Sequence, residues 1–212
     1  MNFDKNFSIK LTNDAFHRMD ETPDHKFYAI PRFTSHIDTG ARAAVTEIYR
    51  KYLPENSKIL DLMSSWLSHF PEEVHYESLV GLGMNDREMA NNKQLNRWVV
   101  HDLNSNPKLP FKDNEFDAAT ICVSIDYLTN PVAVLTDVGR VLKTGAPLII
   151  TYSNRYFETK ATAAWLHLSD EQRAYLVKSF LTNTQCFSEI KLMDCSPSFG
   201  DPLYAAVAKN IS

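Results

Sequence analysis

Four short clusters of small or polar residues follow apolar runs of the kind that form buried strands. They are residues 63–66 (MSSW), 83–85 (GMN), 102–104 (DLN) and 124–127 (SIDY). Hydroxyl, amide and carboxylate groups in such positions can exchange hydrogen bonds with a polar small molecule. If the apolar runs are neighbouring parallel strands, the clusters meet at the carboxyl edge of one sheet, where open α/β sheets bind ligands. The pattern therefore predicts a small-molecule site and leaves its reaction open.

Three titratable side chains near these clusters are candidates for proton transfer. Asp126 could act as a general base toward a bound substrate, or it could cap the turn before Asn130. Its neighbour Tyr127 and the more distant His69 are further candidates. A single histidine is more often structural than catalytic, so the type of residue alone does not assign a role. The sequence therefore assigns no catalytic residue.

Apolar patterns typical of strands and of helices alternate along the chain. They predict the secondary-structure elements that position the four polar clusters. Apolar runs predict strands over residues 58–62, 78–83, 98–100, 116–124, 147–152, 187–193 and 203–208. Apolar residues at helical spacing predict helices over 37–52, 86–95, 131–142 and, in two pieces, 159–181. This alternation predicts a doubly wound, mostly parallel α/β sheet of seven strands. No helix separates the last two strands, so they are expected to form an antiparallel C-terminal hairpin.

Residues 1–37 differ from the rest because neither a helical nor a strand period persists in them, while aromatic residues and histidines are frequent. They are expected to form an N-terminal arm, and residues 38–212 are expected to form one domain. The arm could fill surface grooves of the domain or close over a ligand as a lid. The arm residues that could reach a substrate are His25, Tyr28, Arg32 and His36.

Length, charge and cysteine content exclude several classes of protein. A chain of 212 residues with a net charge of −4 is not expected to bind nucleic acid. No apolar run approaches the ~20 residues that span a bilayer, so no membrane association is expected. The three cysteines stand apart, without metal-ligand spacing. They predict no metal site and a reducing, cytoplasmic environment.

Three segments resemble the class I S-adenosylmethionine-dependent methyltransferases. The most specific one is HDLNSNPKLPFKDNEFD at 101–117, and GRVLKTGAPLII follows it at 139–150. A third segment, VGLGMN at 80–85, resembles the second strand of that family. The resemblance covers about residues 40–209 and implies the Rossmann-like methyltransferase fold of this family.

The sequence departs from the family pattern in two places. The family's first loop is rich in glycine, whereas residues 61–71 contain none. Ser64 and Ser65 in that loop are small and could offer hydroxyl groups instead. The family usually has an acid for the ribose hydroxyls at the end of the second strand, where this chain has Gly83. Both departures imply weakened or altered cofactor binding.

The resemblance implies S-adenosylmethionine as the cofactor and places its contacts at the four strand ends. The residues at those positions are Asp61, Met63, Ser64, Ser65, Gly83, Met84, Asn85, Asp102, Leu103 and Ser124. Asp102 aligns with the residue that contacts the adenine amino group. Asn85 could bind the ribose diol, cap a helix, or do both. Asp61 could hold loop amides beneath the cofactor or simply cap its strand.

The function implied by the resemblance is methyl transfer to an unidentified small-molecule acceptor. The two departures also support an alternative, in which a methyltransferase-like domain no longer turns over and serves as a binding or regulatory module. A nicotinamide-dependent oxidoreductase would fit the fold as well. The sequence lacks a GxGxxG motif after the first strand and has no acid at Gly83, which argues against that third function.

Overall fold

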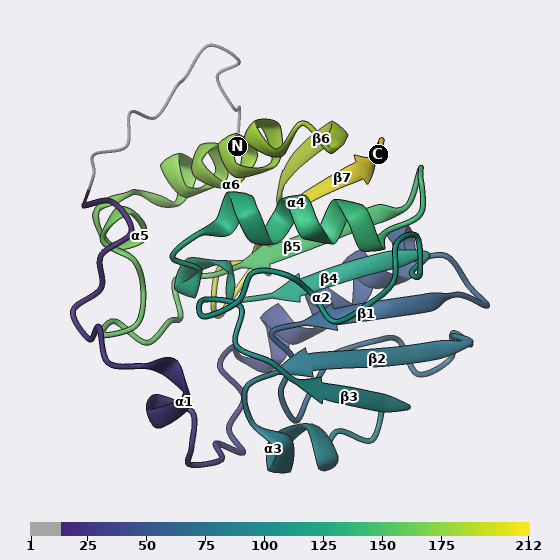
Figure 1. Cartoon of the computed structure of the whole chain (residues 1–212), viewed down its shortest axis with the longest axis horizontal. Helices are drawn as coiled ribbons and strands as arrows, with labels where there is room; N and C mark the ends of the chain where they lie inside the picture. Colours follow the sequence, from purple (N-terminus) through teal and green to yellow (C-terminus); the bar gives the residue numbers. More distant parts are fainter. Residues whose placement is uncertain (1–13) are drawn as a thin grey trace.

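Seven apolar segments form one sheet in the computed structural model, which describes residues 14–212 (Figure 1). The strands are β1 (Lys58–Leu62), β2 (Ser78–Gly83), β3 (Arg97–Val100), β4 (Ala118–Cys122), β5 (Pro147–Tyr152), β6 (Phe187–Asp194) and β7 (Tyr204–Asn210). Their order is β3-β2-β1-β4-β5-β7-β6. Strands β1 to β5 run parallel, and β7 is antiparallel to both of its neighbours. The predicted α/β fold with an antiparallel C-terminal hairpin is confirmed.

The strand order reverses between β1 and β4. The chain winds outward from β1 to β2 and β3 and then crosses back to place β4 on the other side of β1. At such a switch point the loops after neighbouring strands diverge and leave a crevice outside their carboxyl ends. The loops after β1 and β4 border this crevice, and both carry predicted polar clusters.

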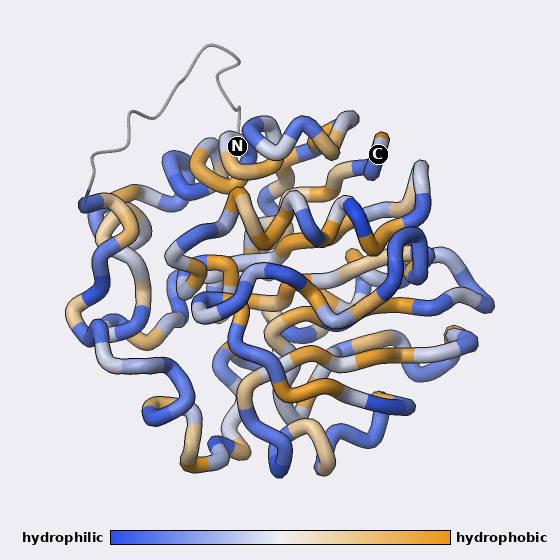
Figure 2. Tube along the Cα trace, in the orientation of Figure 1, coloured by the Kyte–Doolittle hydropathy of each residue, from blue (hydrophilic) through white to orange (hydrophobic). Residues whose placement is uncertain are grey.

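Three long helices cover the two faces of the sheet. Helix α2 (Thr39–Tyr52) packs on one face, and α4 (Pro131–Val141) and α6 (Asp170–Thr184) pack on the other (Figure 1). Each begins at a side-chain cap, and α6 has the complete capping box of Ser169 and Gln172 that its sequence predicted. The strands between these layers form the apolar interior seen in Figure 2. The two faces thus bury two separate core clusters.

Four shorter helical elements lie near the carboxyl edge or in the arm. They are α1 (Asp24–Phe27), α3 (Asp86–Ala90), the 3-10 turn η1 (Ile125–Tyr127) and α5 (Ala163–His167). The helix predicted over 86–95 is therefore wrong beyond Ala90. The Nδ2 of Asn92 turns away to donate to Ser65 O at 2.9 Å and Ser68 Oγ at 2.7 Å. These contacts hold the first loop, and residues 159–162 likewise lie outside the helices predicted there.

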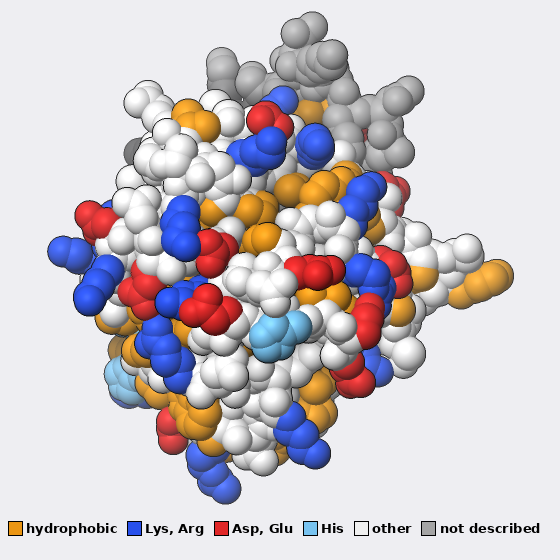
Figure 3. Space-filling view, turned by 90° about the vertical axis from the view of Figure 1, so that its right-hand side faces the viewer, with side chains coloured by type: hydrophobic (Ala, Val, Ile, Leu, Met, Phe, Trp, Pro, Cys, Tyr) orange, Lys and Arg blue, Asp and Glu red, His pale blue; other side chains and the backbone are white. Residues whose placement is uncertain are grey.

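The amino end of the parallel strands has a mixed surface. Figure 3 shows Lys and Arg side chains interspersed with Asp and Glu on this side, without a continuous field of one sign. Among the described helices, none has the length and apolar character needed to cross a bilayer. The other end of the sheet holds the predicted polar clusters and is the end that the arm reaches.

Candidate functional site

The predicted clusters come together around one pocket at the carboxyl ends of β1, β2 and β4. All ten residues expected to contact the cofactor line it: Asp61, Met63, Ser64, Ser65, Gly83, Met84, Asn85, Asp102, Leu103 and Ser124. His69 and Tyr127 line it as well, whereas Asp126 is not among the lining residues. The strand ends singled out in the sequence thus converge on one pocket. The individual roles of these residues remain predictions.

Asp61 organises the glycine-free first loop from beneath. Its buried carboxylate accepts hydrogen bonds from Ser64 Oγ and Ser68 Oγ, each at 2.6 Å, and from Thr120 Oγ1 on β4 at 2.8 Å. Burial raises the pKa of Asp61 even though these three hydroxyls favour the charged form. Asp61 therefore caps the end of its strand, which was one of the two alternatives. Its hydrogen-bond donors are hydroxyl groups and not the loop amides that the other alternative required.

The loop also adopts left-handed backbone without glycine. Met63 has a φ of 55° and His69 a φ of 62°. Residues with a Cβ take this conformation at a cost of about 1 kcal/mol each. The hydrogen bonds to Asp61 offset that cost at one end of the loop. At the other end, Thr46 Oγ1 of α2 donates to His69 O at 2.9 Å.

Gly83 is a glycine because the first loop passes directly over it. Ser64 N donates to Leu82 O at 2.8 Å, so the loop continues beside the end of β2. A Cβ added at Gly83 would lie far inside van der Waals contact with Ser64 O and 3.1 Å from Met89 Sδ. The two departures from the family pattern are therefore one structural feature. A loop without glycine approaches the position where the family has its acid and excludes any side chain there.

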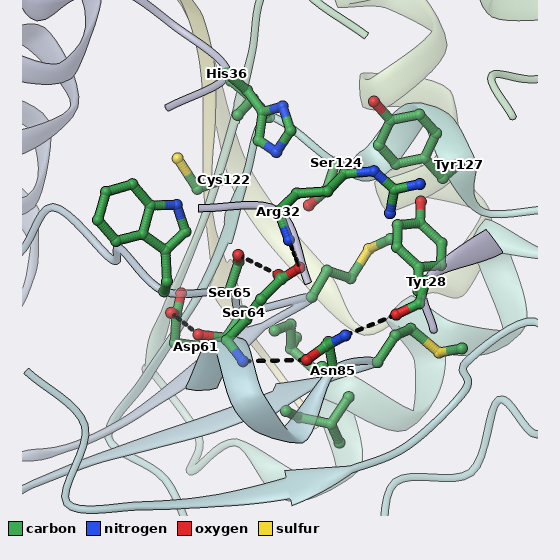
Figure 4. A pocket seen from close by; sticks show the side chains of 18 of the residues that line it. Tyr28, Arg32, His36, Asp61, Ser64, Ser65, Asn85, Cys122, Ser124 and Tyr127 are labelled. Carbon is green, nitrogen blue, oxygen red and sulfur yellow. Dashed lines mark hydrogen bonds between the residues drawn. The ribbon is translucent and has the colours of Figure 1, made fainter. Parts of the chain in front are cut away.

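Asn85 and Glu88 are paired with the N-terminal arm. Asn85 Oδ1 accepts from Glu88 N at 3.1 Å, which confirms the helix cap, while its Nδ2 donates to Tyr28 O at 2.8 Å. Glu88 accepts from Arg32 N at 2.7 Å and from Ser65 Oγ. Figure 4 shows these contacts between the arm and the end of β2. A ribose at this position would have to exchange with backbone groups of the arm.

Glu88 is the pocket carboxylate that sequence reasoning missed. Its spacing from Asn85 suggested a capping box, yet its side chain points to the first loop and the arm instead of back to the cap. Because it lines the pocket close to Gly83, it supplies an acid near the strand end that lacks one. No pattern within residues 85–88 distinguishes these two orientations.

Asp102 fixes the turn after β3. Its Oδ1 accepts from Asn104 N at 3.0 Å and Ser105 N at 3.2 Å, and its Oδ2 accepts from Ser105 Oγ at 2.6 Å. The carboxylate therefore holds the backbone of Leu103 at the pocket wall. The expected contact with adenine remains a prediction, and the structure adds this positioning role.

The candidates for proton transfer separate into two groups. Tyr127 reaches the pocket, but its hydroxyl accepts from Phe157 N at 2.9 Å, and burial raises the pKa of its phenol well above the usual value. Asp126 lies behind it, only 3 % exposed, and burial raises the pKa of its carboxyl to about 8. The prediction that Asp126 lines the reaction side of the pocket is therefore wrong, because η1 turns this side chain into the protein interior. Beside them, the buried Ser124 Oγ has no hydrogen-bond partner within residues 14–212.

A buried ion network anchors the arm to the domain. Asp24 Oδ1 pairs with Arg18 at 2.9 Å and with the fully buried Lys160 at 3.1 Å, and Asn104 donates to Asp24 Oδ2 at 2.8 Å. Burial alone would raise the pKa of Asp24, but these hydrogen bonds outweigh it and lower the pKa. From this anchor the arm runs across the pocket. Tyr28, Arg32 and His36 line the pocket, whereas His25 does not.

The described part of the arm, residues 14–37, adopts the docked alternative, and its closure over a ligand as a lid stays a prediction. This part of the arm is docked through its ion network, and it covers the pocket through its backbone. Residues 1–13 of the predicted arm lie outside the described residues. The division of the chain at residue 37 remains a prediction.

His69 gives the stability of the protein a testable pH dependence. Burial, together with the nearby Arg42, lowers the pKa of His69 to about 4 from its usual 6.5. The unfolded chain therefore binds more protons between these pH values, and the free energy of unfolding falls as the pH drops from 6.5 toward 4. We expect this one group to remove about 2 kcal/mol between pH 7 and pH 5. Asparagine tolerates the left-handed backbone at this position. The free energy of unfolding of His69→Asn, measured by urea denaturation, should therefore fall less between pH 7 and pH 5 than that of the wild type, by about 2 kcal/mol. Equal pH dependence in the two proteins would contradict this assignment.

Comparison with known proteins adds a family match and a common fold. A model of the methyltransferase domain matches residues 64–150. A Haloferax volcanii structure, a complex of the Trm112 methyltransferase activator with a putative methyltransferase, has a TM-score of 0.62 at 13 % identity and covers 82 % of this chain and 90 % of that one. A possible histamine N-methyltransferase from Thermotoga maritima has a TM-score of 0.60 at 16 % identity, with the same shares covered.

A third similar structure contains a cofactor. It is the phosphoethanolamine N-methyltransferase 2 of Haemonchus contortus in complex with S-adenosyl-L-methionine, with a TM-score of 0.58 at 12 % identity. The match covers 80 % of this chain and 52 % of that one. No curated protein matches the sequence. At these identities the structural likeness shows a shared fold and no more.

Proposed function

We propose that this chain, in which residues 64–150 match a model of the methyltransferase domain, is a class I methyltransferase that transfers a methyl group from S-adenosylmethionine to a small-molecule acceptor. One observation carries the proposal. The residues that the family resemblance assigned to the cofactor, which come from four separate segments, line a single pocket at the switch point of the sheet.

The chemistry of the pocket fits this cofactor. Asp61, Glu88 and Asp102 place carboxylates around the pocket, which complements a cationic sulfur and an ammonium group. Leu103 and Leu128 add apolar wall of the kind that an adenine ring requires. Ser124 Oγ is a buried polar group left for a ligand to satisfy.

The residues of the chain contribute mainly position and exclusion of water. When bound, the cofactor supplies an electrophilic methyl group on a positively charged sulfur. Asp102 holds the turn that bears Leu103, and Asp61 holds the first loop. The arm covers the site through Tyr28 and Arg32. Catalysis of this kind draws on proximity and orientation and requires no dedicated nucleophile in the protein. The three free cysteines of the described chain agree with a cytosolic enzyme.

Calorimetric titration with S-adenosylmethionine and S-adenosylhomocysteine tests the proposal. We expect micromolar binding of both, and Asp102→Ala should weaken it at least tenfold because the turn at Leu103 loses its three hydrogen bonds. Asp113→Ala is the matched control, because Asp113 is exposed and pairs with Arg140 away from the pocket. Folded protein that binds neither compound at millimolar concentration would overturn the proposal.

A second candidate function is a binding or regulatory module without turnover. The observation that favours it is the pairing of Asn85 and Glu88 with the arm, which occupies the polar groups closest to the expected ribose position. In that case the titrations above show no cofactor binding, while the folded protein retains the docked arm.

A further inference from the structure

The guanidinium of Arg32 is a charged group that lines the pocket and was not among the predicted cofactor contacts. It lies 4.3 Å from the ring centroid of Phe27 and 5.3 Å from that of Phe157. Its Nη2 donates to Phe27 O at 2.9 Å. Its Nη1 is buried and has no hydrogen-bond partner within residues 14–212. The aromatic rings thus satisfy the faces of the guanidinium and leave an N–H edge without an acceptor.

No carboxylate of the described chain neutralises this charge. Residues 14–212 contain no ion pair that involves the Arg32 side chain. Asp24 is already bound by Arg18, Lys160 and Asn104. Glu88 accepts from the Arg32 backbone instead of its side chain. The nearby acids are therefore committed to other partners.

Arg32 also differs in charge from the rest of the lining. Among the described residues it is the one Lys or Arg that borders this pocket, and the other charged groups there are carboxylates. A planar guanidinium edge can bind the two oxygens of a carboxylate through two parallel hydrogen bonds. Phe157 and Tyr127 line the same pocket, with ring centroids 6.0 Å apart, and provide an apolar wall. Figure 4 shows Tyr127 and Arg32 among the residues that line this pocket. The buried hydroxyl of Ser124 lines the same pocket.

We propose that the methyl acceptor is a small carboxylic acid with an apolar or aromatic body, and that Arg32 binds its carboxylate. The body of this acid lies against Phe157 and Tyr127. Arg32 is in this role a specificity-determining residue. The inference rests on the proposed function, because it assigns the acceptor class for the same pocket.

Benzoate and its neutral isostere benzamide test the inference directly. Each is titrated by calorimetry into full-length protein saturated with S-adenosylhomocysteine. We expect benzoate to bind at least tenfold more tightly than benzamide. Arg32→Gln should abolish that preference. A matching loss of affinity for S-adenosylhomocysteine would instead assign Arg32 to the carboxylate of the cofactor and overturn the inference. Arg32→Lys keeps the charge without the planar edge, so its preference for benzoate should be intermediate.

Arg155→Gln is the matched control. Arg155 pairs with Asp201 at 2.7 Å and does not line the pocket, so this variant should keep the full preference for benzoate. Equal binding of benzoate and benzamide, or benzoate binding that survives in Arg32→Gln, overturns the inference. Absence of benzoate binding to protein that binds S-adenosylhomocysteine also overturns it and leaves the proposed function intact.

The remaining outcomes separate the two proposals. Protein that fails to bind S-adenosylhomocysteine refutes the proposed function, and benzoate is then titrated alone. Binding that depends on Arg32 would in that case still support a carboxylate site. Unchanged thermal melting of Arg32→Gln and Arg32→Lys establishes that the variants are folded.

Discussion

Gly83→Asp, which would restore the acid that the family has at this position, is expected to destabilise the protein strongly instead of improving cofactor binding. The cause is the Cβ rather than the charge, because Ser64 O already occupies the space that a Cβ would take. The first loop is held there by Ser64 N and by the buried carboxylate of Asp61, so it cannot yield cheaply. Overpacking against fixed backbone costs about 3 kcal/mol or more.

Urea denaturation of the wild type, Gly83→Ala and Gly83→Asp measures this effect. Both variants should lose a similar amount of stability, because both carry a Cβ. Met84→Asp is the control, since it introduces the same charge one residue later in the same pocket without a side chain at Gly83. A Gly83→Asp protein with wild-type stability would show that the first loop moves freely and would contradict the account given for the missing acid.

Removal of the Asp61 carboxylate is expected to cost both stability and cofactor affinity. In Asp61→Ala the hydroxyls of Ser64, Ser68 and Thr120 lose their common acceptor. The buried hydroxyls left without that acceptor cost about 3 kcal/mol together. The loop also bears two left-handed residues, Met63 and His69, whose strain is then no longer offset. We therefore expect at least tenfold weaker binding of S-adenosylhomocysteine.

Asp61→Asn tests how much of the lost stability comes from the missing hydrogen-bond acceptor. Its side chain has nearly the same shape and keeps one oxygen as an acceptor, and a serine hydroxyl can rotate to accept from the new amide. It should lose less stability than Asp61→Ala, in thermal melts and urea denaturation at pH 7. If Asp61→Ala binds S-adenosylhomocysteine as tightly as the wild type, the first loop does not contribute to the cofactor site.

Local patterns accounted for the elements of the sheet and for their caps. The strand at 58–62, the helix that starts at Pro131, and the capping box of Ser169 and Gln172 all occur as predicted. Each depends on residues within a few positions of one another, so the sequence contains the whole interaction. The helix predicted over 86–95 failed for the opposite reason. Asn92 leaves the helix to bind the first loop, 24 to 27 residues away.

The sequence by itself determined the fold class and the edge of the sheet where the candidate site lies, because apolar periodicity and the alternation of strands and helices are properties of neighbouring residues. Only the tertiary structure decided what the site contains. It paired Asp61 with Thr120, turned Glu88 toward the arm, and buried Asp126 behind the pocket. It also explained Gly83, whose missing side chain is dictated by a backbone atom of Ser64. Such contacts join segments that meet only after the sheet has formed, and no local pattern records how closely they approach.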